Sequence, residues 1–267
     1  MQASIHGFRM AYTDAGQGAP TLLFIHGFPL SRGAWHKQVE AFALDHRVIA
    51  PDLRGLGESG TPTGPATMSL FADDLVALLR GLKVGPVILV GHSMGGYVAL
   101  NFADRHPGLV EGLVLVGTRA GADTAEGAGK RLATAQKVRT EGATFLVDDM
   151  APKMLAAGHP EVGLVRQVRA LMEPANAFGV ANALEGMADR PDMTDRLAGI
   201  QVPTLVITGT DDVLIPPGES ALLAERIVGA ELELIPGAGH LVALERPEAF
   251  NGLLRAWLTR VIRTAAP

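Results

Sequence analysis

Ser93 is the residue of this chain whose surroundings best suit a nucleophile. It is flanked by Gly91 and Gly95 in the pattern G-x-S-x-G and directly follows the apolar run Val87–Val90. A serine at a sharp turn from a buried strand into a helix has strained backbone angles, so its neighbours must be small. The start of the helix also directs free N–H groups and a positive dipole end at the serine. We therefore predict a nucleophilic Ser93; the alternative is a simple glycine-rich turn.

A serine hydroxyl is a poor nucleophile at neutral pH and needs a base within hydrogen-bond reach. Imidazole can accept and return the proton. Among the eight histidines, His240 follows the apolar run 232–235, on a loop at the carboxyl end of a predicted strand. The base needs a carboxylate that orients it. Asp211 and Asp212 both follow the run Thr204–Ile207 at the same edge. Their position alone leaves both as candidates.

Ester hydrolysis passes through a tetrahedral species whose negative oxygen two backbone N–H groups can stabilise. One donor is expected to be the N–H of Met94, the residue after the nucleophile. The other is expected in the loop that follows the apolar run Thr21–Ile25. Pro29 in that loop is excluded because proline has no N–H.

Short apolar runs without alternation predict the strands that must position these residues. Such runs are typical of a parallel sheet that is covered on both faces. Residues 3–13 instead alternate like an edge hairpin. Amphipathic helical patterns lie between the runs and predict an α/β fold with right-handed crossovers. The predicted strands are Thr21–Ile25, Val87–Val90 and Thr204–Ile207, with fainter candidates at Arg47–Ala50, Leu113–Val116 and Glu231–Ile235. The predicted helices are Ser69–Leu82, with Asp73 and Asp74 on its polar side, Met94–His106 and Phe250–Ile262.

Residues 119–196 have a different pattern, without strand-like runs. Apolar residues recur there at helical spacing, as at Phe178, Ala181, Leu184 and Met187. We predict a helical cap over one edge of the sheet, inserted into a core domain that comprises residues 1–118 and 197–267. The alternative is two ordinary crossover helices with long loops.

The chain resembles the α/β-hydrolase superfamily from Thr21 to its C-terminus. Many members have G-x-x-D at the acid loop with proline four residues later, and Gly209, Asp212 and Pro216 match this spacing. The resemblance therefore implies Asp212 as the acid and Asp211 as a loop residue. It also implies a mostly parallel central sheet with helices on both faces and a helical cap insertion. The order Ser, Asp, His along the chain agrees with it.

Two further segments resemble motifs of this family. His26-Gly27-Phe28 is similar to its H-G-x motif, which implies the Phe28 N–H as the second oxyanion donor. Asp52 to Ser59 is similar to D-x-R-G-x-G-x-S, for which we expect a structural role, with Arg54 joining loops to carboxylates. We expect His26 to hold its loop in place and His92 to pack beneath the nucleophile turn.

Serine at the turn implies an acyl-enzyme, so the substrate must contain an activated carbonyl. The expected activity is that of a serine esterase on small to medium carboxylic esters. The alternatives are a lactonase, a carbon–carbon bond hydrolase of ring-cleavage products, or a ligand receptor. The sequence H-G-F-P at 26–29 also resembles cofactor-free haloperoxidase-like esterases, which implies perhydrolysis as a side activity. Apolar residues are expected to line the pocket, among them Phe28, Met94, Leu214, Leu241 and some of the cap's methionines at 150, 154, 172 and 187. The alternative for these methionines is ordinary core packing within the insertion.

Composition limits the remaining classes of function. The 23 basic and 28 acidic residues give a net charge of −5, which argues against a nucleic-acid partner. Zero cysteines exclude a thiol nucleophile and disulfides. No run of about 20 apolar residues suggests a membrane span, and no signal-peptide pattern begins the chain. A cytoplasmic enzyme with a small-molecule ester substrate and no metal or organic cofactor is expected, while the oligomeric state is open.

Overall fold

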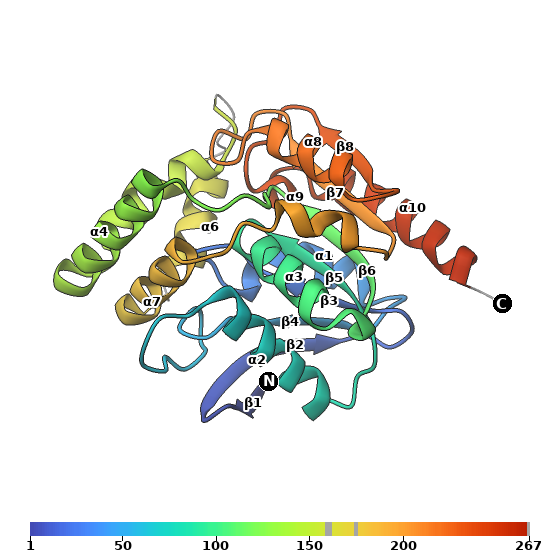
Figure 1. Ribbon diagram of the computed structural model, residues 1–267, viewed down its shortest axis with the longest axis horizontal. Helices are drawn as coiled ribbons and strands as arrows, with labels where there is room; N and C mark the ends of the chain where they lie inside the picture. Colours follow the sequence, from blue (N-terminus) through green and yellow to red (C-terminus); the bar gives the residue numbers. More distant parts are fainter. Residues whose placement is uncertain (158–161, 174–175, 266–267) are drawn as a thin grey trace.

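The computed structural model describes residues 1–157, 162–173 and 176–265, which surround one central sheet (Figure 1). Its eight strands have the order β1-β2-β4-β3-β5-β6-β7-β8. The strands are β1 (Gln2–Ile5), β2 (Phe8–Ala15), β3 (Thr21–Ile25), β4 (Val48–Pro51), β5 (Val87–His92), β6 (Val110–Val116), β7 (Thr204–Gly209) and β8 (Glu231–Ile235).

The pairing of these strands confirms the predicted α/β fold. β1 and β2 form the expected hairpin, and β2 pairs antiparallel with β4, whereas all neighbours from β4 to β8 are parallel. Ile25 at the end of β3 is opposite Gly91, and Gly209 at the end of β7 is opposite Ile235. The loops that follow β3, β5, β7 and β8 therefore begin at the same edge of the sheet.

Successive side chains of the central strands pack into two separate clusters, as a sheet covered on both faces requires. Leu22 and Phe24 belong to the cluster that includes residues of α1 (His36–Phe42) and α10 (Pro247–Ala265). Leu23 and Ile25 belong to the other cluster, which contains residues of α2 (Met68–Gly81), α3 (Met94–Arg105) and α8 (Pro217–Arg226). Helices on both faces were predicted from the sequence, although the positions of α1 and α8 were not.

One detail of α2 corrects the sequence analysis. Thr67 caps the helix by accepting the Leu70 N–H at 3.2 Å, and Asp73 lies on the partly exposed side. Asp74, predicted on the polar side, is instead fully buried. It can be buried because Arg54 donates two hydrogen bonds to its carboxylate, at 2.5 and 2.6 Å.

Between β6 and β7 the described residues contain helices and no strand. This helical segment projects from one side of the sheet (left in Figure 1). Residues 158–161 and 174–175 of the predicted cap lie outside the described residues. Phe178, predicted on an apolar stripe, is 60% exposed, so that part of the pattern was wrong. The elements are α4 (Ala125–Glu141), α5 (Thr144–Met150), η3 (Ala151–Met154), α6 (Val162–Met172), α7 (Ala177–Ala188) and η4 (Thr194–Gly199).

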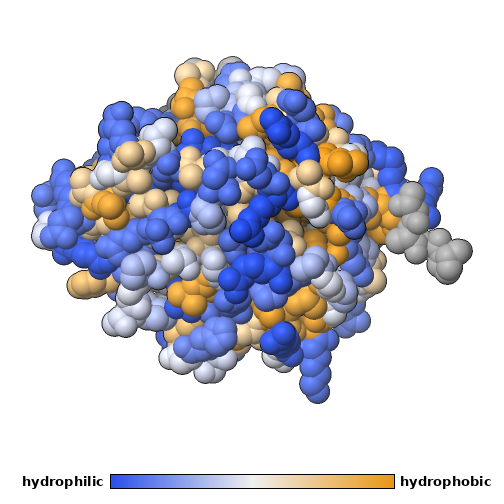
Figure 2. Space-filling model, viewed as in Figure 1, coloured by the Kyte–Doolittle hydropathy of each residue, from blue (hydrophilic) through white to orange (hydrophobic). Residues whose placement is uncertain are grey.

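Three short helical elements complete the described fold: η1 (Arg32–Trp35), η2 (Pro107–Leu109) and α9 (Val242–Glu245). Within the described parts of the chain, we find no helix with the length and apolar character needed to span a bilayer. On the face that Figure 2 shows, hydrophilic side chains are mixed with smaller hydrophobic groups.

Candidate active site

Ser93 lies at the turn between β5 and α3 and has a backbone conformation that is rare for residues with a side chain. Its φ is +53° and its ψ is −117°, which costs on the order of 1–3 kcal/mol. Backbone hydrogen bonds hold this turn: the Ser93 N–H donates to the Val116 carbonyl at 2.9 Å, and the Ser93 carbonyl accepts from the Thr118 hydroxyl at 2.8 Å. The strained serine and the start of α3 are therefore fixed relative to β6.

The glycines around Ser93 are required by close backbone contacts. A Cβ on Gly91 would overlap the Gly95 carbonyl, and a Cβ on Gly95 would overlap the Ile25 carbonyl. Gly27, in the loop after β3, lies against the Ser93 turn, since a Cβ on Gly27 would be 3.0 Å from Ser93 Cβ. The small residues that the sequence motif predicted are thus needed for β3, β5 and α3 to meet.

Asp212 and His240 form a buried pair on neighbouring loops. His240 Nδ1–H donates to Asp212 Oδ2 at 2.8 Å, and neither residue is more than 4% exposed. The other carboxylate oxygen, Oδ1, accepts the N–H groups of Leu214 and Ile215, each at 2.9 Å. Asp211 is exposed and accepts only from the Thr210 hydroxyl among the described residues. Of the two aspartates, it is therefore Asp212 whose carboxylate is bonded to the His240 ring.

His92 connects the nucleophile turn with the loop of His240. Its Nε2–H donates to the His240 carbonyl at 2.9 Å, and the two rings lie 4.7 Å apart. The pKa of His92 lies well below its ordinary value, first because the ring is buried and second because of the neighbouring His240 imidazole. His92 is therefore neutral at neutral pH, with the proton on the nitrogen that contacts His240. We expected only packing from His92, and this hydrogen bond adds a positioning contact.

Gly117, at the end of β6, is a site residue that the sequence analysis missed. Its φ is +48°, and a Cβ there would lie 3.3 Å from Asp212 Oδ2 and 3.5 Å from His240 Nδ1. A side chain at this position would press against the carboxylate–imidazole pair. A glycine directly after the strand-like run Leu113–Val116 was the signal that could have identified it.

The Ser93 hydroxyl is partly exposed, and within the described parts of the chain it makes no hydrogen bond to the His240 ring. The Phe28 and Met94 N–H groups likewise donate to no acceptor in these parts of the chain. Free N–H groups are expected at the first residue of a helix such as Met94. Because Ile25 pairs with Gly91, both N–H groups follow the ends of adjacent strands at the edge where Ser93 lies.

The segments expected to have structural roles make the contacts that those roles require. His26 Nδ1–H donates to the Gly27 carbonyl at 2.9 Å, and its Nε2 accepts the Leu53 N–H at 3.0 Å. Burial lowers the pKa of His26, although Asp52 opposes this effect. Asp52 is fully buried and accepts from Arg32 and from the Glu58 N–H. These contacts hold the loop after β3 against the segment after β4.

An apolar cluster next to His240 is separate from the two clusters of the sheet. It joins Leu30 and Ala34 on the β3 side with Leu241 and Leu244 beside His240. Met154 and Met172 of the helical segment are buried in it, whereas Met187 packs in the main core. Met187 is therefore a core residue and does not contribute to the apolar cluster next to His240.

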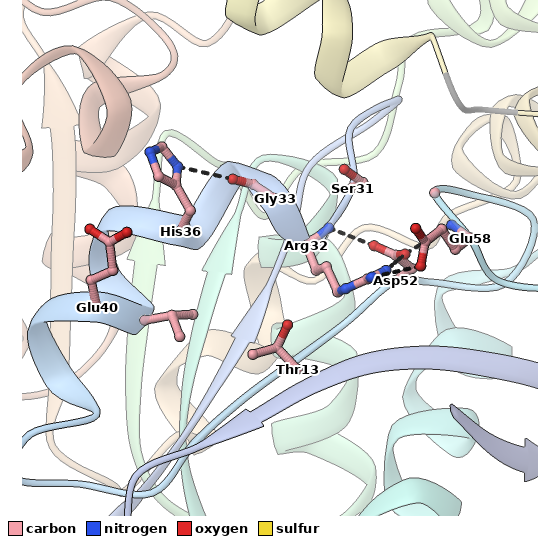
Figure 3. Close-up of a pocket in the computed structure, with 10 residues that line it drawn as sticks. Thr13, Ser31, Arg32, Gly33, His36, Glu40, Asp52 and Glu58 are labelled. Carbon is pink, nitrogen blue, oxygen red and sulfur yellow. Dashed lines mark hydrogen bonds and ion pairs between the residues drawn. The ribbon is translucent and has the colours of Figure 1, made fainter. Parts of the chain in front are cut away.

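A cavity of about 460 Å³ lies outside this constellation, between η1, α1 and the loop after β4 (Figure 3). Four of its polar side chains already have partners: Arg32 contacts Asp52 and Glu58, and His36 Nδ1–H donates to the Gly33 carbonyl. Neither Ser93 nor His240 lines it. We therefore assign it no part in the chemistry of Ser93.

Comparison with known proteins gives consistent results. The family model described as alpha/beta hydrolase fold matches residues 20–247. The chain is 30% identical to 3-oxoadipate enol-lactonase 2 of Acinetobacter baylyi, over 93% of this chain and 92% of that protein. Among solved structures, a malate-bound thermophilic esterase from Thermogutta terrifontis is similar with a TM-score of 0.93, 39% identity and 98% coverage of both chains. An enol-lactonase from Burkholderia xenovorans is similar with a TM-score of 0.90, 30% identity, and coverage of 97% of this chain and all of that one.

Proposed function

The chain belongs to the α/β-hydrolase family of hydrolases, and from this premise we propose that it is a serine esterase that cleaves small to medium carboxylic esters. The observation that carries the proposal is the strained Ser93 turn, joined through His92 to a buried Asp212–His240 pair. We assign Ser93 as nucleophile, His240 as base and Asp212 as the acid that orients the base, because the loops that hold them begin at one edge of the sheet.

In the proposed reaction, Ser93 Oγ attacks the ester carbonyl as its proton moves to His240 Nε2. Because His240 Nδ1–H is bonded to Asp212, Nε2 is the free acceptor of the neutral ring. The tetrahedral oxyanion accepts hydrogen bonds from the Phe28 and Met94 N–H groups. The alcohol leaves with the proton from His240, and water then hydrolyses the acyl-Ser93 ester by the same steps, which returns the free enzyme. Hydrogen bonds at such sites often tighten only when substrate binds.

The surroundings support an uncharged acyl group. Phe28, Met94 and Leu241 are buried apolar residues, and the cluster beside His240 continues from Leu241 to methionines of the helical segment. Unbranched methionine side chains adapt to ligands of different shape. An acyl chain of modest length fits such surroundings better than a phosphorylated substrate.

A panel of p-nitrophenyl esters of increasing acyl length, with the wild type and Ser93→Ala, tests the proposal. We expect turnover by the wild type with a preference for short to medium chains. The Ser93→Ala variant should lose activity by a factor on the order of 10⁶ in kcat. Equal activity of both proteins would exclude Ser93 as the nucleophile.

The two aspartates of the acid loop provide a matched pair of variants. Asp212→Asn should lower kcat by a factor on the order of 10⁴, because the imidazole loses the carboxylate that orients it. Asp211→Asn, one residue away and exposed, should retain the wild-type rate. The reverse result would assign the acid to Asp211.

Lactone hydrolysis is the second candidate function, favoured by the enol-lactonases among the similar proteins. The same serine chemistry opens a lactone, with the alcohol retained on the acyl chain. Including lactones in the ester panel compares the two directly. A kcat/KM for a lactone above that of every ester would make lactonase the better description.

Perhydrolysis stays a prediction from the H-G-F-P segment. We expect brominated monochlorodimedone to form in the presence of acetate, bromide and hydrogen peroxide. The Ser93→Ala protein sets the background, and a wild-type signal no higher than this background would remove the idea.

A further inference from the structure

Glu245 is a carboxylate that bonds two distant parts of the backbone. It ends the short helix α9, five residues after His240. Its Oε1 accepts the N–H of Gly239 at 2.9 Å, and its Oε2 accepts the N–H of Ala156 at 2.8 Å. One side chain thus joins the residue before His240 to the helical segment, 83 positions earlier in the chain than Gly239.

The residue after His240 is also bonded to this part of the helical segment. The Leu241 N–H donates to the Met154 carbonyl at 3.0 Å. The backbones approach so closely that a Cβ on Gly239 would lie 2.6 Å from the Leu155 carbonyl carbon. Both neighbours of His240 are therefore fastened to residues 154–156, on one side through Glu245 and on the other directly.

We propose that Glu245 is a positioning residue for His240, through which the location of residues 154–156 determines where the imidazole lies. A carboxylate has two acceptor oxygens and can satisfy both N–H groups, each with a charge-assisted bond. A neutral amide has one acceptor oxygen, and its NH₂ would face an N–H donor. The geometry therefore requires the carboxylate and not merely a side chain of its size.

Contacts around Glu245 support a role specific to this loop. His240 is held from its other side by the His92 hydrogen bond to its carbonyl, and its ring by Asp212. Arg246, next in sequence, donates to the Gly237 carbonyl at 2.9 Å and to the main-chain carbonyl of Glu245 at 3.0 Å, and among the described residues it makes no hydrogen bond to the Glu245 carboxylate. Burial raises the pKa of Glu245, although the two N–H groups oppose this. Burial disfavours the charged form of Glu245, so a carboxylate at this place beside His240 supports the proposed positioning role.

The test compares Glu245→Gln with Asp192→Asn. Asp192 is a matched control because it also accepts two backbone N–H groups from separated segments, those of Thr194 at 2.8 Å and Ala122 at 3.4 Å. It makes no contact with the His240 loop among its described hydrogen bonds. For p-nitrophenyl ester hydrolysis, Glu245→Gln should lower kcat about tenfold or more with little change in KM. Asp192→Asn should match the wild type.

A second measurement reports on position directly. The proton between His240 Nδ1 and Asp212 should give a low-field ¹H NMR resonance that is absent from His240→Ala. In Glu245→Gln this resonance should shift or broaden, and in Asp192→Asn it should stay unchanged. Should Glu245→Gln not fold by circular dichroism, Glu245→Asp replaces it, since that shorter side chain retains the charge but cannot span both N–H groups.

Wild-type kcat and an unmoved resonance in the folded Glu245 variant would overturn the inference. The inference rests on the proposed function, but its failure can be distinguished from the failure of that function. If the wild type neither hydrolyses esters nor reacts at Ser93 with a fluorophosphonate, the proposed function fails. The NMR comparison of Glu245→Gln with Asp192→Asn still decides whether Glu245 positions His240.

Discussion

The helical segment between β6 and β7 consists of two parts that are attached to the molecule in different ways. The first part, here called the α4–α7 pair, comprises α4 and α7, which pack side by side (Figure 1). The second, here called the α5–α6 unit, comprises α5, η3 and α6. Buried residues of the α4–α7 pair belong to the main core cluster. Those of the α5–α6 unit mostly belong to the separate cluster that includes Leu241 and Leu244.

Backbone contacts reinforce the difference. In α7, Gly179 and Gly186 lie directly against the backbone of Gly55 and Ala66 in the core. Asn182, between them, donates to the Pro62 carbonyl at 3.0 Å. Among the described residues, no glycine of the α5–α6 unit contacts residues 55–66 in this way. The Met154 carbonyl of η3 instead accepts the N–H of Leu241, the residue after His240. We infer that the α4–α7 pair is part of the scaffold, whereas the α5–α6 unit acts on the site. The predicted cap over residues 119–196 would on this inference consist of two regions with different roles.

The largest expected effects come from two buried methionines, one in each region. Met187 of the α4–α7 pair is 2% exposed and Met172 of the α5–α6 unit 1%. Met187→Ala should lower the global free energy of unfolding by about 3–4 kcal/mol, because it opens a cavity in the main core. Met172→Ala should lower it less, since a satellite cluster can open locally, and should reduce kcat/KM more. Urea unfolding and ester hydrolysis measure both, and equal profiles would contradict the division.

Gly186→Ala tests the attachment of α7. The new Cβ would overlap the Ala66 carbonyl, which is backbone and cannot rotate away. We expect the free energy of unfolding to fall by about 2–3 kcal/mol, measured as a lower urea midpoint at constant m-value. Unchanged stability would mean that α7 can shift away from the core.

Acid should weaken the α4–α7 pair through Asp123. This carboxylate accepts from Arg119 and from Arg131 of α4, both at 2.5 Å, and contacts Arg190 at 2.9 Å. Burial alone would raise the pKa of Asp123, but the bonds from Arg131 and Arg190 outweigh it and the pKa is lowered. Its stabilisation is thus present above the unfolded-state pKa of about 3.9 and is lost as pH falls through the lower folded-state pKa.

Asp123→Asn should therefore cost about 2 kcal/mol at pH 7. The difference from the wild type should shrink below about pH 4, because the Asp123 carboxylate binds a proton first in the unfolded wild type and, at lower pH, in the folded state. Urea unfolding of both proteins at pH 7 and pH 3 measures this difference. A difference that stayed constant across this range would exclude a charge-based contribution.

Gly163→Ala in α6 should have the smallest effect, in the opposite direction. Among the described residues, a Cβ at Gly163 meets no atom within 4 Å, so we expect only the better helix propensity of alanine to act. The expected gain in the free energy of unfolding is at most about 1 kcal/mol, measured by urea unfolding, and the rate of ester hydrolysis should not change. Destabilisation at this open position would show that the effect of Gly186→Ala is not specific to its backbone contact.

Much of the fold could be predicted because its signals are local. Apolar runs such as Thr21–Ile25 and Glu231–Ile235 have the bounds that the structure gives to β3 and β8. Gly91 and Gly95 were expected to be small residues at a strained turn, and close backbone atoms leave no room for a side chain at either position. For the acid, the family motif selected Asp212, and the structure pairs this residue with His240.

The sequence by itself therefore determined the central strands, the helices α2, α3 and α10, the glycine-rich turn at Ser93 and the loops at the carboxyl edge of the sheet. Periodicity and turn chemistry are properties of neighbouring residues, so they can be read along the chain. Only the tertiary structure decided that Gly117 lies under the carboxylate–imidazole pair, that Glu245 joins Gly239 to Ala156, and that the helical segment has two attachments. In these contacts the backbone of one residue meets a residue that is distant in the chain, and backbone atoms are the same in every residue type. No pattern of side chains along the chain records which of them will meet.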